Sequence, residues 1–270
     1  MTHNLLSMEI DKIYLGDCLE LMKEIPDGSV DCIVTSPPYD NLRKYGGIGE
    51  GWTFEAFQAI AKEIARILTD GGVCVWIVQD GCVNGSETGT SFRQALWFME
   101  CGLGLYDTMI WEKPSPQAPT EGRYYDVFEY MFVFCKGKKP SHMNLLCDHK
   151  NKSAGSVSNK ETRSCAEDRK TTGEKRVVKE FSGRFNVWQI PRENNGSGHP
   201  AVFPYALARD HVVSWSNEGD TILDPFMGSG TTAIAAIREK RHFIGFELNK
   251  EYYDKALQRI NRERQQLSLF

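Results

Sequence analysis

The run from Val73 to Val78 is apolar at every position, without polar alternation. A strand of this kind must be covered on both faces, which is typical of a parallel sheet between two layers of helices. Runs that predict strands occur at 10–15, 30–35, 73–78, 105–111, 128–135, 220–223 and 242–248. Helical periodicity occurs at 18–25, 54–68, 91–101, 205–215, 231–240 and 251–265. This order predicts an α/β fold with a doubly wound, mostly parallel sheet of seven strands.

The length and composition are those of a globular protein with one large α/β domain or two small ones. The chain has 270 residues, of which 41% are hydrophobic, and a formal net charge of −4. Its apolar runs are too short for a membrane span, and Met1 to Asp11 lacks a signal-peptide pattern, so we expect a cytoplasmic protein. The eight cysteines show no C-x-x-C spacing, and we interpret them as reduced thiols, with no metal site.

The composition changes after Lys136. Between Lys150 and Lys179 there are nine Lys or Arg residues and four Asp or Glu residues, and apolar residues are few. The sequence therefore predicts a flexible insertion at 137–185 between two halves of one domain, 1–136 and 186–270. The insertion is either a solvated linker or a basic arm that contacts phosphates. The candidate phosphate contacts are Arg43 and Lys44 of an earlier loop, and Lys150, Lys152, Arg163, Arg169, Lys170, Lys175 and Arg176.

The segment Thr35-Ser36-Pro37-Pro38-Tyr39 follows directly after the strand predicted at 30–35. Two prolines end the strand, because neither can donate a ladder hydrogen bond and both fix φ. A polar side chain, a rigid turn and an aromatic ring therefore lie together at the carboxyl end of a strand, where open α/β sheets bind ligands. The alternative is a proline-rich turn in which Tyr39 is a packing residue.

The segment from Asp224 to Thr232 has the layout of a nucleotide site: a strand, then Gly228-Ser229-Gly230, then a helix. Glycines let the backbone approach a ligand closely. Glu247 ends the next strand, where an acid can accept both hydroxyls of a ribose, so we expect a ligand that contains a nucleoside. Asp224 suits a cationic group, such as an ammonium or a sulfonium, better than a pyrophosphate. Its alternative role is that of a helix-capping carboxylate.

Together, Asp-Pro-Phe-Met-Gly-Ser-Gly-Thr-Thr and Thr-Ser-Pro-Pro-Tyr resemble the amino-group DNA methyltransferases that use S-adenosylmethionine. Their order resembles the permuted subgroup, with the catalytic region first, then a target-recognition insert, then the cofactor loop. Gly16-Asp17 resembles the turn that binds the adenine amino group, and the segment 199–204 resembles the one beside the methionine part. The resemblance covers nearly the whole chain apart from about 137–185, and it implies a Rossmann-like methyltransferase fold. The implied cofactor-binding residues are Asp17, Thr35, His199, Pro200, Phe203, Asp224, Pro225, Phe226, Gly228, Ser229, Gly230, Thr231, Thr232 and Glu247.

The resemblance also implies a mechanism, with Ser36, Pro37, Pro38 and Tyr39 as the catalytic residues. The Ser36 hydroxyl and the Pro37 carbonyl would accept the two N–H groups of an exocyclic amine, and the rigid turn would hold both acceptors in place. Tyr39 would stack on a base flipped out of duplex DNA, and no metal would be needed. Members with Ser before Pro-Pro-Tyr mostly methylate N4 of cytosine, so we expect this reaction, with N6 of adenine as the alternative.

Other functions remain as alternatives. A methyltransferase for RNA or small molecules would not need the basic insertion, and a silent DNA-binding module would not need intact Asp17, Ser36, Tyr39, Asp224 and Glu247. A dinucleotide oxidoreductase would need a third glycine, where Ala233 stands. The recognition site, a partner endonuclease of a restriction-modification system, a bacterial or phage origin and homodimerisation stay open.

The segment Gln266-Leu267-Ser268-Leu269-Phe270 resembles the short peptide that docks bacterial proteins on the replication sliding clamp. The alternative is that Leu269 and Phe270 fold back on the protein itself. We predict that the clamp retains the full chain in a pull-down and loses it when 266–270 are deleted, because Gln266, Leu267 and the two apolar anchors at the free end, Leu269 and Phe270, are removed. Equal recovery of both chains would contradict docking.

Overall fold

The computed structural model describes residues 8–39, 52–117, 122–163, 169–193 and 204–267. The chain divides into two compact units. The first unit combines Met1–Asn144 with Asn186–Phe270, and the second is Leu145–Phe185. Residues 137–144 belong to the first unit, where the Ser141 N–H donates to the Gly71 carbonyl at 2.9 Å.

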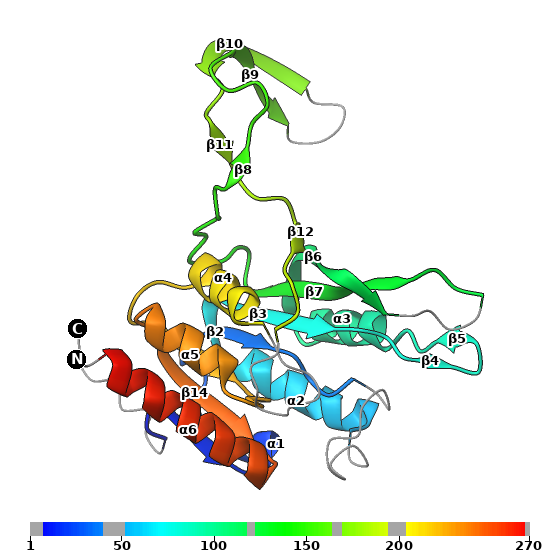
Figure 1. Ribbon diagram of the computed structural model, residues 1–270, viewed down its shortest axis with the longest axis vertical. Helices are drawn as coiled ribbons and strands as arrows, with labels where there is room; N and C mark the ends of the chain where they lie inside the picture. The colour runs from blue at the N-terminus through cyan, green and yellow to red at the C-terminus, as the bar shows by residue number, and fades with distance from the viewer. Residues whose placement is uncertain (1–7, 40–51, 118–121, 164–168, 194–203, 268–270) are drawn as a thin grey trace. The chain divides into compact units, whose positions relative to one another are not determined.

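The first unit contains one large sheet, and its strands are parallel except for one (Figure 1). β7 is antiparallel to both of its neighbours, β3 and β6. In spatial order the strands are β1 (Lys12–Leu15), β14 (His242–Glu247), β13 (Thr221–Asp224), β2 (Val30–Thr35), β3 (Leu68–Val78), β7 (Asp126–Lys136), β6 (Leu103–Gln117) and β12 (Val187–Gln189). The predicted mostly parallel α/β sheet is therefore confirmed.

The predicted count of seven strands is wrong, because β12 is an eighth strand. It has only three residues, which is too few for a periodic pattern to be recognised in the sequence. β12 runs parallel to β6, with Val187 opposite Ile110, and so extends that edge of the sheet.

Helices form two groups, as expected for a sheet that is covered on both faces. The first group is α1 (Cys18–Met22), α2 (Phe54–Ile67) and α3 (Thr90–Glu100); the second is α4 (Tyr205–Trp215), α5 (Thr231–Arg238) and α6 (Lys250–Leu267). Within each group, consecutive helices contact each other, and Figure 1 shows α4, α5 and α6 one after another across the sheet.

The interior strand β3 explains why both helical groups are needed. Cys74, Trp76 and Val78 belong to the hydrophobic cluster that α1, α2 and α3 complete. Val73, Val75 and Ile77 alternate with them and are also fully buried, although they lie outside that cluster. Period-two alternation places the two sets on opposite faces, so β3 is covered on both sides, as its apolar run predicts.

The second unit consists of short antiparallel ladders that hydropathy did not predict. β8 (His149–Lys150) pairs with β11 (Phe181–Ser182), and β9 (Val157–Arg163) pairs with β10 (Arg169–Val177). The first unit contains a further hairpin, in which β4 (Cys82–Val83) and β5 (Ser86–Glu87) have two residues each. The ladders of the second unit contain polar or charged residues at most positions, so an apolar pattern could not reveal them.

Within the described ranges, no helix is long and apolar enough to cross a membrane. The described cysteines, which exclude Cys165, are free thiols. No group of three or more His, Cys, Asp or Glu side chains that could hold a metal ion occurs in the part of the chain that the structure describes.

The glycine before α5 provides a test of how the fold is packed. Gly230 has φ +84°, and a Cβ atom there would lie 3.2 Å from the Ala256 Cβ of α6. Gly219 has φ +88° and would place a Cβ in open space. We predict that Gly219→Ala lowers the free energy of unfolding by about 1–2 kcal/mol through the left-handed backbone alone. We expect Gly230→Ala to lower it by about 1 kcal/mol more, because α6 must also shift.

Urea unfolding of both variants measures this difference. Because the two glycines have nearly the same positive φ, Gly219→Ala is the matched control. Equal losses would show that α6 accommodates the extra methyl group without strain.

Candidate active site

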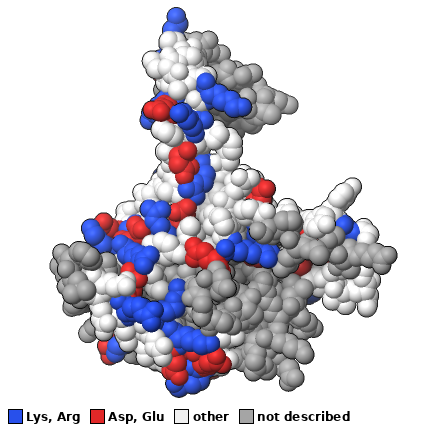
Figure 2. Space-filling model, viewed as in Figure 1, with Lys and Arg blue, Asp and Glu red and all other residues white. Residues whose placement is uncertain are grey.

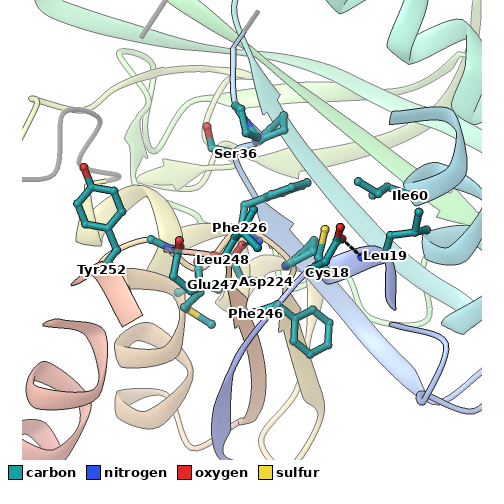
Figure 3. Close-up of a pocket in the computed structure, with 18 of the residues that line it drawn as sticks. Cys18, Leu19, Ser36, Ile60, Asp224, Phe226, Phe246, Glu247, Leu248 and Tyr252 are labelled. Carbon is teal, nitrogen blue, oxygen red and sulfur yellow. Dashed lines mark hydrogen bonds between the residues drawn. The ribbon is translucent and has the colours of Figure 1, made fainter. Parts of the chain in front are cut away.

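A cavity of about 250 Å³ lies at the carboxyl ends of β1, β2, β13 and β14 (Figure 3). Because these strands are parallel, the segments that follow them meet at one edge of the sheet. The wall residues that follow or end the strands are Gly16, Asp17, Cys18 and Leu19 after β1; Ser36, Pro37 and Pro38 after β2; Asp224 to Ser229 at β13; and Phe246, Glu247 and Leu248 at β14. The two segments that the sequence singles out, 35–39 and 224–232, thus border one cavity.

The carboxylate of Asp224 in the cavity wall accepts three hydrogen bonds. The donors are the Thr35 hydroxyl at 2.6 Å, the Thr232 hydroxyl at 2.7 Å and the Phe226 N–H at 3.0 Å. Only 5% of the residue is exposed, and burial raises the pKa of Asp224 to about 6, against the hydrogen bonds, which lower it. Thr35 and Thr232 therefore hold a carboxylate whose negative charge is poorly solvated.

Of the predicted cofactor-binding residues that the structure describes, two do not line the cavity. Thr35 is buried beside Asp224 and orients it, so its contribution is to the position of that carboxylate. Gly230 is the left-handed N-cap of α5 and lets α6 approach closely. Neither residue could be distinguished from a ligand contact by its type alone.

The glycine loop, Gly228-Ser229-Gly230, is held by side chains from the end of β14 and from α6. The Gly228 N–H donates to Glu247 Oε2 at 2.8 Å, and the Asn249 N–H donates to Glu247 Oε1 at 2.8 Å. Burial raises the pKa of Glu247. From α6, Arg259 donates to the Ser229 carbonyl and, at 2.9 Å, to the Ser229 hydroxyl. The sequence analysis missed Arg259, because it lies 30 residues from its partner on a charged helix.

One buried hydroxyl in the cavity wall has no hydrogen-bond partner among the described residues. This atom is Thr231 Oγ1, at the first position of α5. Buried polar atoms are nearly always satisfied, so an unpaired one in a cavity wall points to a ligand. The N-terminal N–H groups of α5 add a preference for an anionic group at the same place.

Another part of the cavity wall is largely apolar. Trp52 and Phe226 meet edge to face, with ring centroids 5.4 Å apart, and Ile60 of α2 adds an aliphatic side chain to the wall. Asp17 also lines the cavity, where it accepts the Leu19 N–H at 2.8 Å and caps α1. A flat heteroaromatic ring with an amino group would fit such a wall. The sequence analysis missed Trp52, Ile60 and Tyr252, which belong to no recognisable motif.

Ser36 is half-buried and lines the cavity together with Pro37 and Pro38. Tyr39 is only 5% exposed; its hydroxyl lies 2.8 Å from Ser36 Oγ and donates to Glu129 Oε2 at 2.5 Å. Its ring does not line the cavity in this structure, so stacking on a base remains a prediction that requires the ring to be uncovered. Glu129 in turn pairs with Lys113 at 2.6 Å.

The sequence analysis missed Glu129 and Lys113. For Glu129 the available signal was a charged residue inside the apolar run 128–135. Lys113 lies beyond the strand predicted at 105–111, and only the structure places it in β6. Charged residues of these types are almost never fully buried unless they are paired.

Several predicted site residues lie outside the described residues: Arg43, Lys44, His199, Pro200 and Phe203. In the second unit Lys150, Lys152, Lys175 and Arg176 are exposed, and the register of β9 and β10 places Arg163 opposite Arg169. The side chains of Arg163, Arg169 and Lys170 are not among those described. Acidic groups lie among the basic ones in this unit, and Arg184 pairs with Asp148 (Figure 2). In the chain tail, Gln266 is exposed, and Leu269 and Phe270 lie beyond the described part.

The chain is similar to known proteins along most of its length. A family model described as DNA methylase matches residues 30–258. The orphan methyltransferase M.BamHII of Bacillus amyloliquefaciens is 49% identical over 253 residues, which is 88% of this chain and 92% of that protein. The type II methyltransferase M.Cfr9I of Citrobacter freundii is 28% identical over 289 residues, or 93% of this chain and 88% of that protein.

Two solved structures are similar in fold. The PvuII DNA methyltransferase (cytosine-N4-specific) superposes with a TM-score of 0.68 at 22% identity, covering 93% of this chain and 90% of that one. A putative DNA modification methylase of Thermus thermophilus, solved with S-adenosyl-L-methionine, has a TM-score of 0.62 at 25% identity and covers 93% of each chain.

The raised pKa of Asp224 predicts a pH-dependent stability. The value of about 6 in the folded protein exceeds the unfolded value of about 3.9, so proton uptake favours the folded state. Asp224 therefore contributes stability below about pH 4, and this contribution is lost as the pH rises through 6. We predict that the free energy of unfolding of Asp224→Asn, minus that of the unchanged protein, rises by about 2 kcal/mol from pH 4 to pH 7.

Urea unfolding at four pH values without ligand measures this difference. Subtraction removes the other titrating groups, which the two proteins share. A difference that stays flat would show that folding does not raise the pKa of Asp224.

Proposed function

The chain belongs to the N6/N4 DNA methylase family and is an S-adenosylmethionine-dependent DNA methyltransferase, and from this premise we propose that it methylates the N4 amino group of cytosine in duplex DNA. The observation that carries the proposal is the position of Ser36 and Pro37 on the wall of the cavity that Asp224 and Glu247 also line. A hydrogen-bond acceptor for the substrate amine thus borders the same space as the acids suited to the cofactor. The runner-up is N6 of adenine.

The residues present fit S-adenosylmethionine. We propose that Glu247 accepts the ribose hydroxyls, that Asp17 accepts the adenine amino group, and that Phe226 packs on the adenine ring. At the other end, the unpaired Thr231 hydroxyl and the N-terminus of α5 suit the carboxylate of the methionine part, and Asp224 suits its ammonium and sulfonium charges. The remaining proposed contacts are Thr35, acting through Asp224, and His199, Pro200, Phe203, Pro225, Ser229 and Thr232.

The chemistry follows from what the Ser36 turn offers to an amine. The lone pair of an exocyclic amino nitrogen is delocalised into the base, which makes it a poor nucleophile. Acceptance of its two N–H groups by the Ser36 hydroxyl and the Pro37 carbonyl would localise that lone pair, and the two prolines hold these acceptors without further ordering. When bound, S-adenosylmethionine supplies an activated methyl group whose leaving group is a neutral thioether, so no acid is required.

The base must leave the helix to reach this turn. Flipping costs roughly a few kcal/mol, and stacking on an aromatic side chain returns about 1–3 kcal/mol. We propose that Tyr39 provides this stacking once its ring is uncovered, while its hydroxyl keeps its bond to Glu129.

We propose cytosine rather than adenine because of Ser36. The neutral hydroxyl of Ser36 is an acceptor that the resemblance links mostly to N4 of cytosine, and the PvuII enzyme of similar fold is described as cytosine-N4-specific. The difference between the two bases lies in pocket shape as well as in this acceptor, so the product must be identified directly.

DNA contacts are proposed for the second unit. Its exposed Lys150, Lys152, Lys175 and Arg176 are placed to neutralise phosphates and give salt-dependent binding. We propose that 145–185 contributes to target recognition and that the enzyme works in a bacterial or phage setting, inside the cell, as restriction-modification methyltransferases do. The clamp-docking tail and a homodimer are further proposals about its partners.

Nucleoside mass spectrometry tests the proposed function. Incubation of the protein with S-adenosylmethionine and mixed unmethylated DNA is expected to yield N4-methylcytosine. Ser36→Ala is expected to lower turnover about 100-fold with little change in cofactor binding, because one preorganised acceptor is lost.

Ser29→Ala is the matched control, since Ser29 stands at the other end of the same strand region and its hydroxyl bonds to the Pro26 carbonyl at 2.7 Å. N6-methyladenine as the product would overturn the choice of base. Unchanged turnover of Ser36→Ala would overturn the acceptor role.

A further inference from the structure

A buried ion pair lies behind the Ser36 turn. Lys113 Nζ of β6 and Glu129 Oε1 of β7 are 2.6 Å apart, and their side chains are 1% and 4% exposed. Burial of two charges carries a large desolvation penalty that their attraction rarely exceeds, so such a pair is weak evidence for a purely stabilising role.

The two side chains of the ion pair also form hydrogen bonds to other residues. Lys113 Nζ donates to Gln79 Oε1 at 3.3 Å, and the Gln79 amide nitrogen donates to Asp126. Glu129 Oε2 faces the other way and accepts the Tyr39 hydroxyl at 2.5 Å. The Tyr39 hydroxyl oxygen lies 2.8 Å from Ser36 Oγ. A continuous polar chain therefore runs from Asp126 to the wall of the cavity.

The chain has one consistent direction of hydrogen bonding. A carboxylate that is paired with an ammonium group carries no proton, so Glu129 can only accept from Tyr39. Tyr39 has a single hydroxyl proton, and it is given to Glu129, so the Tyr39 oxygen can only accept from Ser36. Ser36 must then donate its own proton to Tyr39, which leaves both lone pairs of Ser36 Oγ available to the substrate.

We propose that Glu129, held as a carboxylate by Lys113, is a positioning residue that sets Ser36 as a pure acceptor toward the substrate amine. This inference rests on the proposed function, since it assigns a polarity to the same acceptor. Without Glu129, the Tyr39 hydroxyl is free to donate to Ser36, and Ser36 can turn its proton toward the amine. An acceptor fixed in advance needs no reorganisation when the amine reacts.

The test is a mutant cycle in single-turnover methyl transfer, with cofactor and DNA saturating. Lys113→Met/Glu129→Leu removes both charges and the acceptor of the Tyr39 proton and keeps the volumes similar, so that no unpaired charge is left in the interior. We expect this double variant and Tyr39→Phe each to slow transfer about tenfold, with cofactor and DNA binding unchanged. Combined, the three changes are expected to be no slower than Tyr39→Phe alone, because Glu129 acts only through the Tyr39 hydroxyl.

A second cycle leaves the ion pair intact. Tyr39→Phe is expected to slow the unchanged protein but to have no further effect on Ser36→Ala. Multiplying losses in either cycle would overturn the proposal, because a merely structural pair would affect the rate independently of these hydroxyls. This second cycle keeps the proposal testable if the double variant fails to fold.

A readout without turnover separates the proposal from the proposed function. Tyrosine labelled with ¹³C at Cζ gives one signal that is missing in Tyr39→Phe and is thereby assigned. We expect this signal to move upfield in Lys113→Met/Glu129→Leu, since the phenol no longer donates to a carboxylate. An unmoved signal overturns the hydrogen-bond chain, even if the protein methylates DNA. A moved signal with no methylated base in the unchanged protein would place the fault in the proposed function.

Discussion

The active site depends on one carboxylate that joins two segments from opposite ends of the chain. Asp224 accepts hydrogen bonds from Thr35, which lies 189 residues away, and from Thr232 in the following helix. These bonds tie the end of β2, where the Ser36 turn begins, to the end of β13, where the glycine loop begins. Because both strands are parallel and paired side by side, this side chain holds the Ser36 turn and the segment that begins at Asp224 next to each other.

The same carboxylate gives the cavity wall a poorly solvated negative charge. Asp224 is nearly fully buried, and burial dominates over its three hydrogen bonds in setting its pKa. Glu247 adds a second acid whose pKa is also raised by burial. A cationic ligand would offset this poorly solvated charge, whereas a pyrophosphate would add to it. Local electrostatics at a strand end, which the sheet alone does not determine, would thus discriminate between ligands of opposite charge.

Sequence patterns predict those features that depend on local periodicity and fail for those that depend on pairing across the sheet. The run 73–78 is recognisable because both faces of β3 are buried, and Asp224 and Ser36 are recognisable because they stand where strands end. β12 has only three residues, which is too few for a periodic pattern. The ladder at 157–177 has too many polar and charged residues to show apolar alternation. The sequence gives no sign that Lys113 and Glu129 are partners. Their ion pair is recognised only in the structure, where β6 and β7 place their charged atoms 2.6 Å apart. The roles of Thr35 and Gly230 are likewise decided by neighbours that are distant in sequence.

The arrangement of the sheet also shows how segments that lie far apart in the sequence meet at one cavity. β1, near the start, pairs with β14, near the end, and Asp11 joins His242 at 2.9 Å. The strands that carry Asp17, Glu247 and Asp224 are therefore consecutive in space, although two belong to the last third of the sequence and one to its beginning. Parallel strands deliver their following loops to one edge regardless of the order in which the chain visits them. What the site requires is adjacency at that edge, and the ladders from β1 to β2 supply it.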